Sequence, residues 1–378
     1  MKITNLELNN FNSEKFRYFH PSLTCLQDNR IMAVMQTINA GDYYGEPEFA
    51  ITADGGKTWT EPQKIPAFRH KRLSDSPFVQ AVADVRCFTM QDGSVAAFGC
   101  TTFYTSQGCA SWDKSIDIAP PPGRAVYAVW SPESGTWSNG GILPLPGIER
   151  SYRTSCTQAV LLENNKIILP VYFDTGIPVD HFGYKASRFA SLTAIYGQNG
   201  SKFEFIAQSN QLEIRNNRGC IEPSAVRLPD GSYAMTMRAE DGNMYYSVSK
   251  DALNWSEPAP WVWDDNTAIK TASTQQHWVR IGDKVFLVYT RSDGSNDHLM
   301  RYRAPLYIAE VNTTSGQLLR TTEQVVFKRK CRDEAEALYG NFHCAQFNAN
   351  CAVITDAALF HIQKQTSTEV MAAMITAD

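Results

Sequence analysis

Residues 88–99 read FTMQDGSVAAFG and residues 226–238 read VRLPDGSYAMTMR. In both segments two apolar runs flank an Asp-Gly pair, which tolerates positive φ angles and matches the twist of paired strands, so each predicts a β-hairpin. Four more segments have the same design: TCLQDNRIMAVM at 24–35, LLENNKIILPVY at 161–172, VRIGDKVFLVYTR at 279–291 and QFNANCAVITD at 346–356. The sequence therefore predicts six hairpins.

The spacing of these hairpins indicates a repeat. Their turns fall at positions 28, 92, 164, 230, 283 and 349, and intervals of this length suit one four-stranded blade with its loops. The segment from Ile3 to Leu8 alternates in polarity and is expected to add a strand to the last blade. We predict an all-β, six-bladed β-propeller that occupies residues 1–378 as a single domain. A seven-bladed ring or a β-sandwich is the alternative.

A second motif accompanies the hairpins. Residues 52–59, TADGGKTW, fit the Asp-box pattern S/T-x-D-x-G-x-T-W, and weaker copies occur at 131–137 and 249–255. The Asp carboxylate can accept backbone N–H bonds across the turn, glycine supplies a positive φ, and the Trp fills space between neighbouring blades. We interpret the boxes as structural turns with no chemical role.

Composition restricts the partners. The net charge is −4, the pI is near 6.0, and no Lys/Arg run exceeds three residues, so a nucleic-acid partner is not expected. No window is long and apolar enough to span a membrane, and the first 16 residues lack the apolar run of a signal peptide. We predict a cytoplasmic protein, secreted or periplasmic if a leader was removed. Nine cysteines without CxxC spacing predict reduced thiols.

The fourth hairpin provides the most specific motif. Glu222 lies eight residues before the turn residue Asp230, and Arg238 lies eight residues after it. Together with the Asp boxes, this arrangement resembles the sialidases, which carry a Glu and an Arg at these places. The resemblance implies that Arg238 and Arg303 bind a substrate carboxylate, because guanidinium groups fit this anion bidentately. Arg301 competes with Arg303 for the second position.

The resemblance also implies catalytic residues. Tyr339 occupies the place of the sialidase nucleophile, and Glu222 would take its proton, because a neutral phenol is a weak nucleophile. Asp42 matches the general acid by position, and Glu46 and Glu48 are alternatives. No cofactor motif and no metal-ligand spacing occurs in the sequence.

One position departs from the family. Sialidases begin with Phe-Arg-Ile-Pro, but this chain has Phe19 where the first cluster arginine is expected. Either Arg17 reaches the site through a bulge, or His20 replaces the arginine, or the site does not bind the carboxylate of sialic acid.

The function implied is an exo-acting glycoside hydrolase that removes a terminal acidic sugar with retention of configuration. Two alternatives remain: a non-catalytic propeller that binds carbohydrate, and a lyase or hydrolase that acts on uronic-acid-containing glycans with His20 or a loop histidine as base. The expected partner is an acidic carbohydrate, while the sequence leaves the sugar, its linkage and the oligomeric state open.

Overall fold

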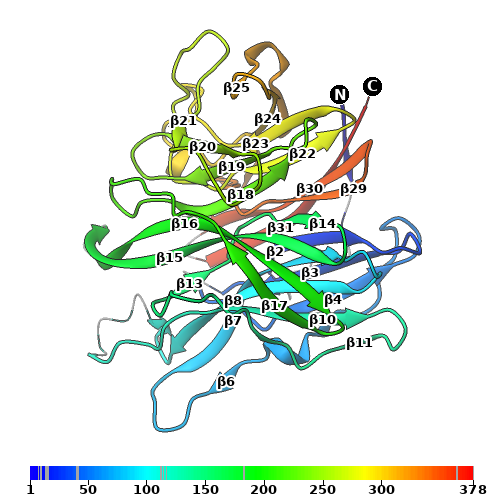
Figure 1. Cartoon of the computed structure of the whole chain (residues 1–378), viewed down its shortest axis with the longest axis vertical. Helices are drawn as coiled ribbons and strands as arrows, with labels where there is room; N and C mark the ends of the chain where they lie inside the picture. Colours follow the sequence, from blue (N-terminus) through cyan, green and yellow to red (C-terminus); the bar gives the residue numbers. More distant parts are fainter. Residues whose placement is uncertain are drawn as a thin grey trace.

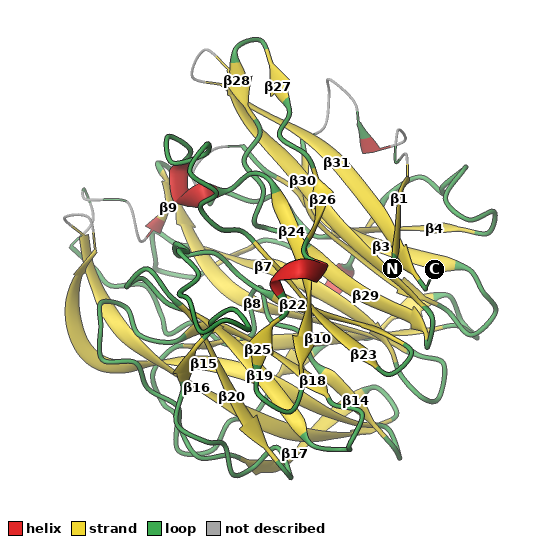
Figure 2. Cartoon of the chain, turned by 90° about the horizontal axis from the view of Figure 1, so that it is seen from above, coloured by secondary structure: helices red, strands yellow, loops and turns green. Residues whose placement is uncertain are grey.

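The computed structural model describes residues 1–6, 8, 11–12, 17–39, 42–110, 113, 115, 117–181, 184–362 and 365–377. Strands dominate these residues, and the helical segments are short 3₁₀ turns such as η2 (Pro66–Phe68), η4 (Met300–Tyr302) and η5 (Arg320–Thr322) (Figure 2). The arrangement is that of an all-β propeller. None of the helices formed by the described residues is long and apolar enough to span a membrane.

Consecutive stretches of chain form consecutive antiparallel sheets. We number the larger sheets by the chain order of their first inner strand. The first three sheets contain the following strands: β2 (Tyr18–Cys25), β3 (Ile31–Thr37), β4 (Glu48–Thr52) and β5 (Gln63–Lys64) in sheet 1; β6 (Lys71–Arg72), β7 (Val79–Thr89), β8 (Val95–Thr105), β9 (Gly108–Cys109), β10 (Ala125–Ser131), β11 (Thr136–Trp137) and β12 (Gly141–Ile142) in sheet 2; and β13 (Tyr152–Arg153), β14 (Val160–Leu162), β15 (Lys166–His181), β16 (Tyr184–Asn199) and β17 (Lys202–Gln208) in sheet 3.

The second half of the chain continues in the same way. Its strands are β18 (Ile221–Arg227), β19 (Tyr233–Arg238), β20 (Met244–Ser249) and β21 (Ala259–Pro260) in sheet 4; β22 (His277–Ile281), β23 (Lys284–Tyr289), β24 (Leu306–Asn312), β25 (Gln317–Leu318) and β26 (Gln324–Phe327) in sheet 5; and β29 (His343–Asn348), β30 (Cys351–Ile362), β31 (Gln365–Thr376) and β1 (Lys2–Leu6) in sheet 6, with β27 (Cys331–Arg332) and β28 (Ala335–Glu336) as a separate ribbon.

All six predicted hairpins are confirmed as antiparallel pairs: β2–β3, β7–β8, β14–β15, β18–β19, β22–β23 and β29–β30. The expected closure is confirmed as well, because β1 pairs with β31 in the register Lys2↔Thr376. The first strand of the chain thus completes the last sheet. Figure 1 shows the two termini next to each other, with the red C-terminal strands between the yellow and the blue ones.

The hydrophobic core lies between neighbouring sheets. Five clusters of buried side chains follow the chain: sheets 1 and 2 share one, sheets 2 and 3 the next, then sheets 3 and 4, and sheets 4 and 5. The largest cluster joins sheets 5, 6 and 1 and so closes the circle. Because the apolar contacts are made between the faces of the sheets, the inner edges are left for polar side chains.

Two Asp boxes have the predicted turn geometry. Asp54 accepts hydrogen bonds from the backbone N–H of Thr58 at 2.9 Å and from its hydroxyl at 2.6 Å, and Gly55 and Gly56 have φ angles of 72° and 96°. In the second box Asp251 accepts the N–H groups of residues 253 and 254. The carboxylates therefore close the turns, as the sequence indicates. No disulfide bond joins the cysteines that the structure describes.

Candidate functional site

Four residues at one end of the inner strands have unusual backbone angles. His20, Asp84, Cys156 and Glu222 have φ between 50° and 54°, and they stand at equivalent places in sheets 1 to 4. The register of the inner hairpin shifts at three of them, between Phe19 and Ser22, Ala83 and Arg86, and Ile221 and Ser224. A β-bulge changes the direction in which side chains point. A positive φ angle costs energy in a residue that has a Cβ atom, and residues with such angles are often found at functional sites. We call this end of the inner strands the mouth.

Glu222 and Arg238 meet at the mouth because one hairpin positions both. Residue 238 pairs with Ile221 across β18 and β19, and its guanidinium lies 2.6 Å from the Glu222 carboxylate, with 9% and 12% of the two side chains exposed. Burial lowers the pKa of Arg238, but the charge and hydrogen bond of Glu222, together with nearby Cys156 and Glu240, raise the pKa overall. Arg238 also donates a hydrogen bond to Ser273 at 2.7 Å. The sequence prediction that these two residues share one rim is confirmed.

Two further arginines face Arg238 from the next sheet. Arg303 is 8% exposed, and its Nε has no hydrogen-bond partner among the described residues. Burial and then the positive charge of Arg238 lower the pKa of Arg303. The pKa of Arg301 is lowered to about 10, first by burial and then by Arg238 and Arg303. Both candidates therefore belong to one cluster, although they lie in and after the η4 turn and not on a strand as predicted.

Asp42 stands beside this cluster. It is exposed, accepts a hydrogen bond from the Tyr44 hydroxyl at 3.0 Å, and its charge acts on the pKa of Arg303. The two alternative carboxylates have other partners. Glu46 pairs with Lys64 and accepts the backbone N–H of residue 70, while Glu48 accepts the Tyr18 hydroxyl at 2.9 Å. Of these three carboxylates, Asp42 is the one whose charge acts on the pKa of Arg303.

His20 takes the place of the missing first arginine. It is 2% exposed, stacks on Phe19 with ring centroids 4.5 Å apart, and forms an ion pair with Asp84. Burial raises the pKa of Asp84, but His20, Arg86 and Arg153 together lower it overall. Arg17 does not reach the mouth, because its guanidinium donates to the Thr366 carbonyl at 3.1 Å. Of the two replacements considered from sequence, the structure brings His20 to the site and leaves Arg17 outside.

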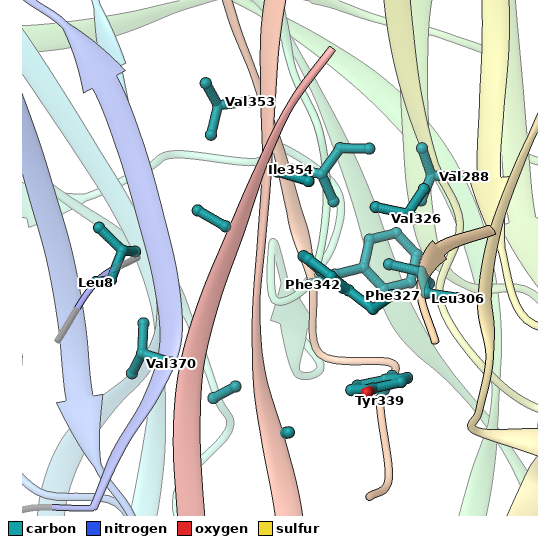
Figure 3. Close-up of a cluster of buried hydrophobic side chains, with 14 of the residues drawn as sticks. Leu8, Val288, Leu306, Val326, Phe327, Tyr339, Phe342, Val353, Ile354 and Val370 are labelled. Atoms are coloured by element: carbon teal, nitrogen blue, oxygen red, sulfur yellow. The ribbon is translucent and has the colours of Figure 1, made fainter. Parts of the chain in front are cut away.

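Tyr339 does not lie in the site. The side chain is fully buried in the largest core cluster, where it packs beside Phe327 and Phe342 (Figure 3). Its hydroxyl donates to the backbone carbonyl of Lys328 at 2.6 Å, and burial raises the pKa of this phenol. A phenol whose proton is held by a carbonyl in an apolar core is not presented to a ligand or to Glu222. The sequence placed it wrongly because the chain before β29 is irregular.

The structure adds residues that sequence reasoning missed. Arg153, which is half-buried, and Tyr172, which is buried, belong to sheet 3 near the mouth, and Glu222 contributes, after burial, to the raised pKa of Tyr172. Asp356 of β30 is fully buried and accepts the N–H groups of residues 340 and 357, and burial raises its pKa to about 7. No local motif marks these residues, because the site forms only when separate sheets come together.

Four arginines (153, 238, 301 and 303) gather near the mouth. Of the four carboxylates placed there, Asp84 and Glu222 are paired with His20 and Arg238, burial raises the pKa of Asp356 to about 7, and Asp42 is exposed. Arg301 and Arg303 form no ion pair with a described carboxylate, and cations without such a partner favour the binding of an anion. The described residues contain no group of three or more His, Cys, Asp and Glu side chains suited to a metal ion.

Comparison with known proteins supports the fold. A protein of unknown function from Dyadobacter fermentans has a TM-score of 0.66 at 14% identity, covering 100% of this chain and 98% of that one. The Trypanosoma rangeli sialidase in complex with the inhibitor DANA has a TM-score of 0.61 at 14% identity, covering 98% of this chain and 59% of that one. The intramolecular trans-sialidase from Ruminococcus gnavus in complex with oseltamivir carboxylate has a TM-score of 0.58 at 14% identity, covering 98% and 96%.

These identities are low, so the likeness establishes the fold of the sialidases and not their activity. No curated protein sequence matches this chain. Residues 101–329, more than half of the chain, match the family described as BNR repeat-like domain. The chain belongs to this BNR repeat-like domain family.

Proposed function

We propose that this chain is a six-bladed propeller, one blade per sheet, that binds the carboxylate of a terminal acidic sugar with Arg238, Arg301 and Arg303. The observation that carries this proposal is the buried guanidinium of Arg303, whose Nε has no hydrogen-bond partner among the described residues. In agreement with it, burial and mutual repulsion lower the pKa of Arg301 and of Arg303. A bound carboxylate would relieve that repulsion. Two of the structural neighbours carry sialic acid or oseltamivir carboxylate, ligands with this group.

The chemistry of the cluster favours a carboxylate over a simple point charge. Each guanidinium offers a planar fork of N–H donors that matches the two oxygens of a carboxylate. Arg238 is held by Glu222 and Ser273, and fixing the fork in advance reduces the entropy lost on binding. Glu222 would thus orient the clamp before the sugar arrives.

We further propose glycoside hydrolysis of the sialidase type as the reaction. Asp42, exposed at the rim, is the proton donor to the leaving oxygen, because it lies beside the cluster that would hold the sugar. Glu222 is the base, and its Oε2 has no hydrogen-bond partner among the described residues. Since Tyr339 lies in the core, Tyr172, whose pKa the charge of Glu222 helps to raise, takes the role of nucleophile in this proposal.

A non-catalytic sugar-binding propeller is the second candidate. It is favoured by the position of Tyr339 in the core and by the engagement of Glu222 with Arg238 at 2.6 Å. Both candidates require the same carboxylate clamp, so binding and turnover must be measured separately.

Calorimetry with a carboxylated monosaccharide and its methyl ester tests the clamp. Wild type should bind the acid and not the ester, and Arg303→Lys should weaken binding of the acid tenfold or more because it loses the fork. Arg329→Lys is the matched control, since Arg329 is partly exposed and paired with Glu336 away from the mouth. Equal binding of acid and ester by wild type, or no binding of either, would refute the carboxylate clamp.

A second measurement separates the two candidates. Wild type and Glu222→Gln are assayed with a panel of aryl glycosides of acidic sugars. A hydrolase should release the aryl group in wild type, and the Gln variant should lose turnover. Binding of the acid without release of any aryl group would leave the non-catalytic propeller as the function.

A further inference from the structure

Beyond the mouth, the inner strands enclose a second polar space. A cavity of about 530 Å³ is bounded by all six sheets, by residues of β2, β7, β18, β22 and β29 and by the chain at 157–161. None of the mouth residues His20, Asp84, Glu222, Arg238 or Arg303 lines it. It therefore extends along the axis from the mouth toward the hairpin turns, and we call it the axial cavity.

The charge of the axial cavity is one-sided. The ionisable side chains of its lining include Arg86, Arg227, Arg280, His277 and His343, and none of the described lining residues is Asp or Glu. Arg280 donates to the carbonyl of Arg227, so one of these cations is anchored at the end near the turns. A space lined by cations without carboxylates has a positive potential.

Arg86 is the strongest evidence for a ligand. It is 3% exposed, and none of its three guanidinium nitrogens has a hydrogen-bond partner among the described residues. A guanidinium stays charged in proteins, and a buried charge without a partner costs several kcal/mol. The carboxylates that influence it, Asp84 and Glu222, are already paired with His20 and Arg238. Asp84 and Glu222 act on the charge of Arg86 from a distance, but neither forms an ion pair with it in the described part of the chain.

Two buried histidines supply further donors beside Arg86. His277 is 1% exposed, and its Nδ1 lies 2.8 Å from the Ser224 hydroxyl while its Nε2 has no partner among the described residues. His343 is 4% exposed, and both of its ring nitrogens lack a partner in the same part of the chain. The two ring centroids are 6.4 Å apart. A neutral imidazole can still donate one N–H bond, so both rings can contribute to a polar site.

We propose that the axial cavity binds a small monovalent anion, of halide or nitrate size, held by the guanidinium of Arg86 and by N–H groups of His277 and His343. A monoanion matches the single positive charge of Arg86 at this end of the cavity, because the neutral histidines contribute N–H donors but no charge. Burial and the nearby Arg86 both keep His277 neutral by lowering its pKa. The anion would offset the buried charge and connect three sheets at the axis.

Thermal unfolding in halide-free buffer tests this site. Protein dialysed into sodium gluconate is titrated with sodium bromide or nitrate at constant ionic strength. Wild type should show a saturable rise in Tm of about 2–4 °C, as expected for a ligand that binds only the folded state. Arg86→Met should lose this response and have a higher Tm than wild type in gluconate, because the buried charge without an ion-pair partner is gone.

The controls make every outcome decisive. Arg303→Lys changes the mouth and not the cavity, so it should keep the bromide response even where it weakens sugar binding. If Arg86→Met does not fold, His343→Phe removes one N–H donor from the site and should weaken the bromide response at least fivefold. Crystals soaked in bromide should give an anomalous peak beside Arg86. A Tm that is the same in bromide and gluconate, or a response that survives in both cavity variants, would overturn the proposal.

Discussion

Replacing Arg301 with methionine should stabilise the free protein. Methionine keeps the aliphatic volume of the side chain and removes its charge. Among the described residues the Arg301 guanidinium makes no hydrogen bond or ion pair, and Arg238 and Arg303 repel it. An arginine that served the fold would have a carboxylate partner, so its loss would destabilise. An arginine kept for a ligand is a cost to the free protein, and its removal relieves that cost.

The lowered pKa of Arg301 gives the size of the effect. The pKa falls from its usual 12.5 to about 10, which corresponds to roughly 3 kcal/mol at 1.36 kcal/mol per pH unit. Because the side chain is partly exposed, solvent screening reduces this to about 1–2 kcal/mol. The unfolded chain binds this proton more tightly than the folded one, so the cost is fully present at pH 7 and disappears only as pH rises from about 10 toward 12.5.

Urea unfolding at pH 7 measures this difference. Arg291→Met is the matched control, because Arg291 forms an ion pair with Glu323 at 2.5 Å and lies over the Tyr307 ring at 4.6 Å. Arg291→Met should lower the free energy of unfolding by several kcal/mol, since it leaves Glu323 without its partner. If Arg301→Met lowers that free energy too, Arg301 has a structural role and the reasoning about the anion cluster fails.

Three other variants test separate parts of the structure. Trp255→Ala should lower the free energy of unfolding by about 3–5 kcal/mol, and Trp59→Ala should lower it clearly less. The reason is that Trp255 is 6% exposed and donates a hydrogen bond to Thr193 of the neighbouring sheet, while Trp59 is only partly buried. Equal losses in urea unfolding would contradict this difference in packing. The free energy of unfolding of Asp356→Asn should rise by about 1–3 kcal/mol relative to wild type between pH 5 and pH 7.5. Burial raises the folded-state pKa of Asp356 to about 7, so wild type loses stability as pH rises through that window. If the stabilities of the two proteins change in parallel with pH, the carboxyl does not titrate in this way. Glu222→Gln should lower the free energy of unfolding by about 2–4 kcal/mol because Arg238 loses its countercharge, and a circular-dichroism melt indistinguishable from wild type would mean that the pair is solvated.

The features that sequence predicted well are those formed within one hairpin. The Asp-Gly turns, the Asp box at 52–59 and the closing strand β1 depend on alternation and on turn residues, which are local. Glu222 and Arg238 belong to the same class, because the register of a single hairpin places them opposite each other. The spacing of Glu222 and Arg238 from the turn therefore predicted correctly that they lie next to each other in the folded hairpin.

The features that sequence missed depend on irregular chain and on contacts between sheets. Tyr339 precedes β29 in a segment without regular pairing to a hairpin, so a difference of one or two residues decides whether its ring faces the mouth or the core. Arg301 lies in the η4 turn with a φ of 58°, where strand alternation does not apply. Arg86 and Tyr172 reach the axis only because bulges and long strands from separate sheets converge there. The sequence pattern of a single sheet cannot predict which side chains from different sheets meet at the axis.

The placement of the core explains how the axis can carry so much charge. The apolar clusters lie between the faces of neighbouring sheets, so the fold does not need apolar side chains at the inner edges. Each inner edge can then present a strained residue such as Asp84 or Glu222 at the mouth and, two positions later, a polar side chain such as Arg86 toward the axial cavity. The apolar packing between the sheet faces offsets the free-energy cost of the unpaired guanidiniums and the positive φ angles. Since only anions can offset that cost at the axis, both the mouth and the cavity are expected to select ligands by negative charge.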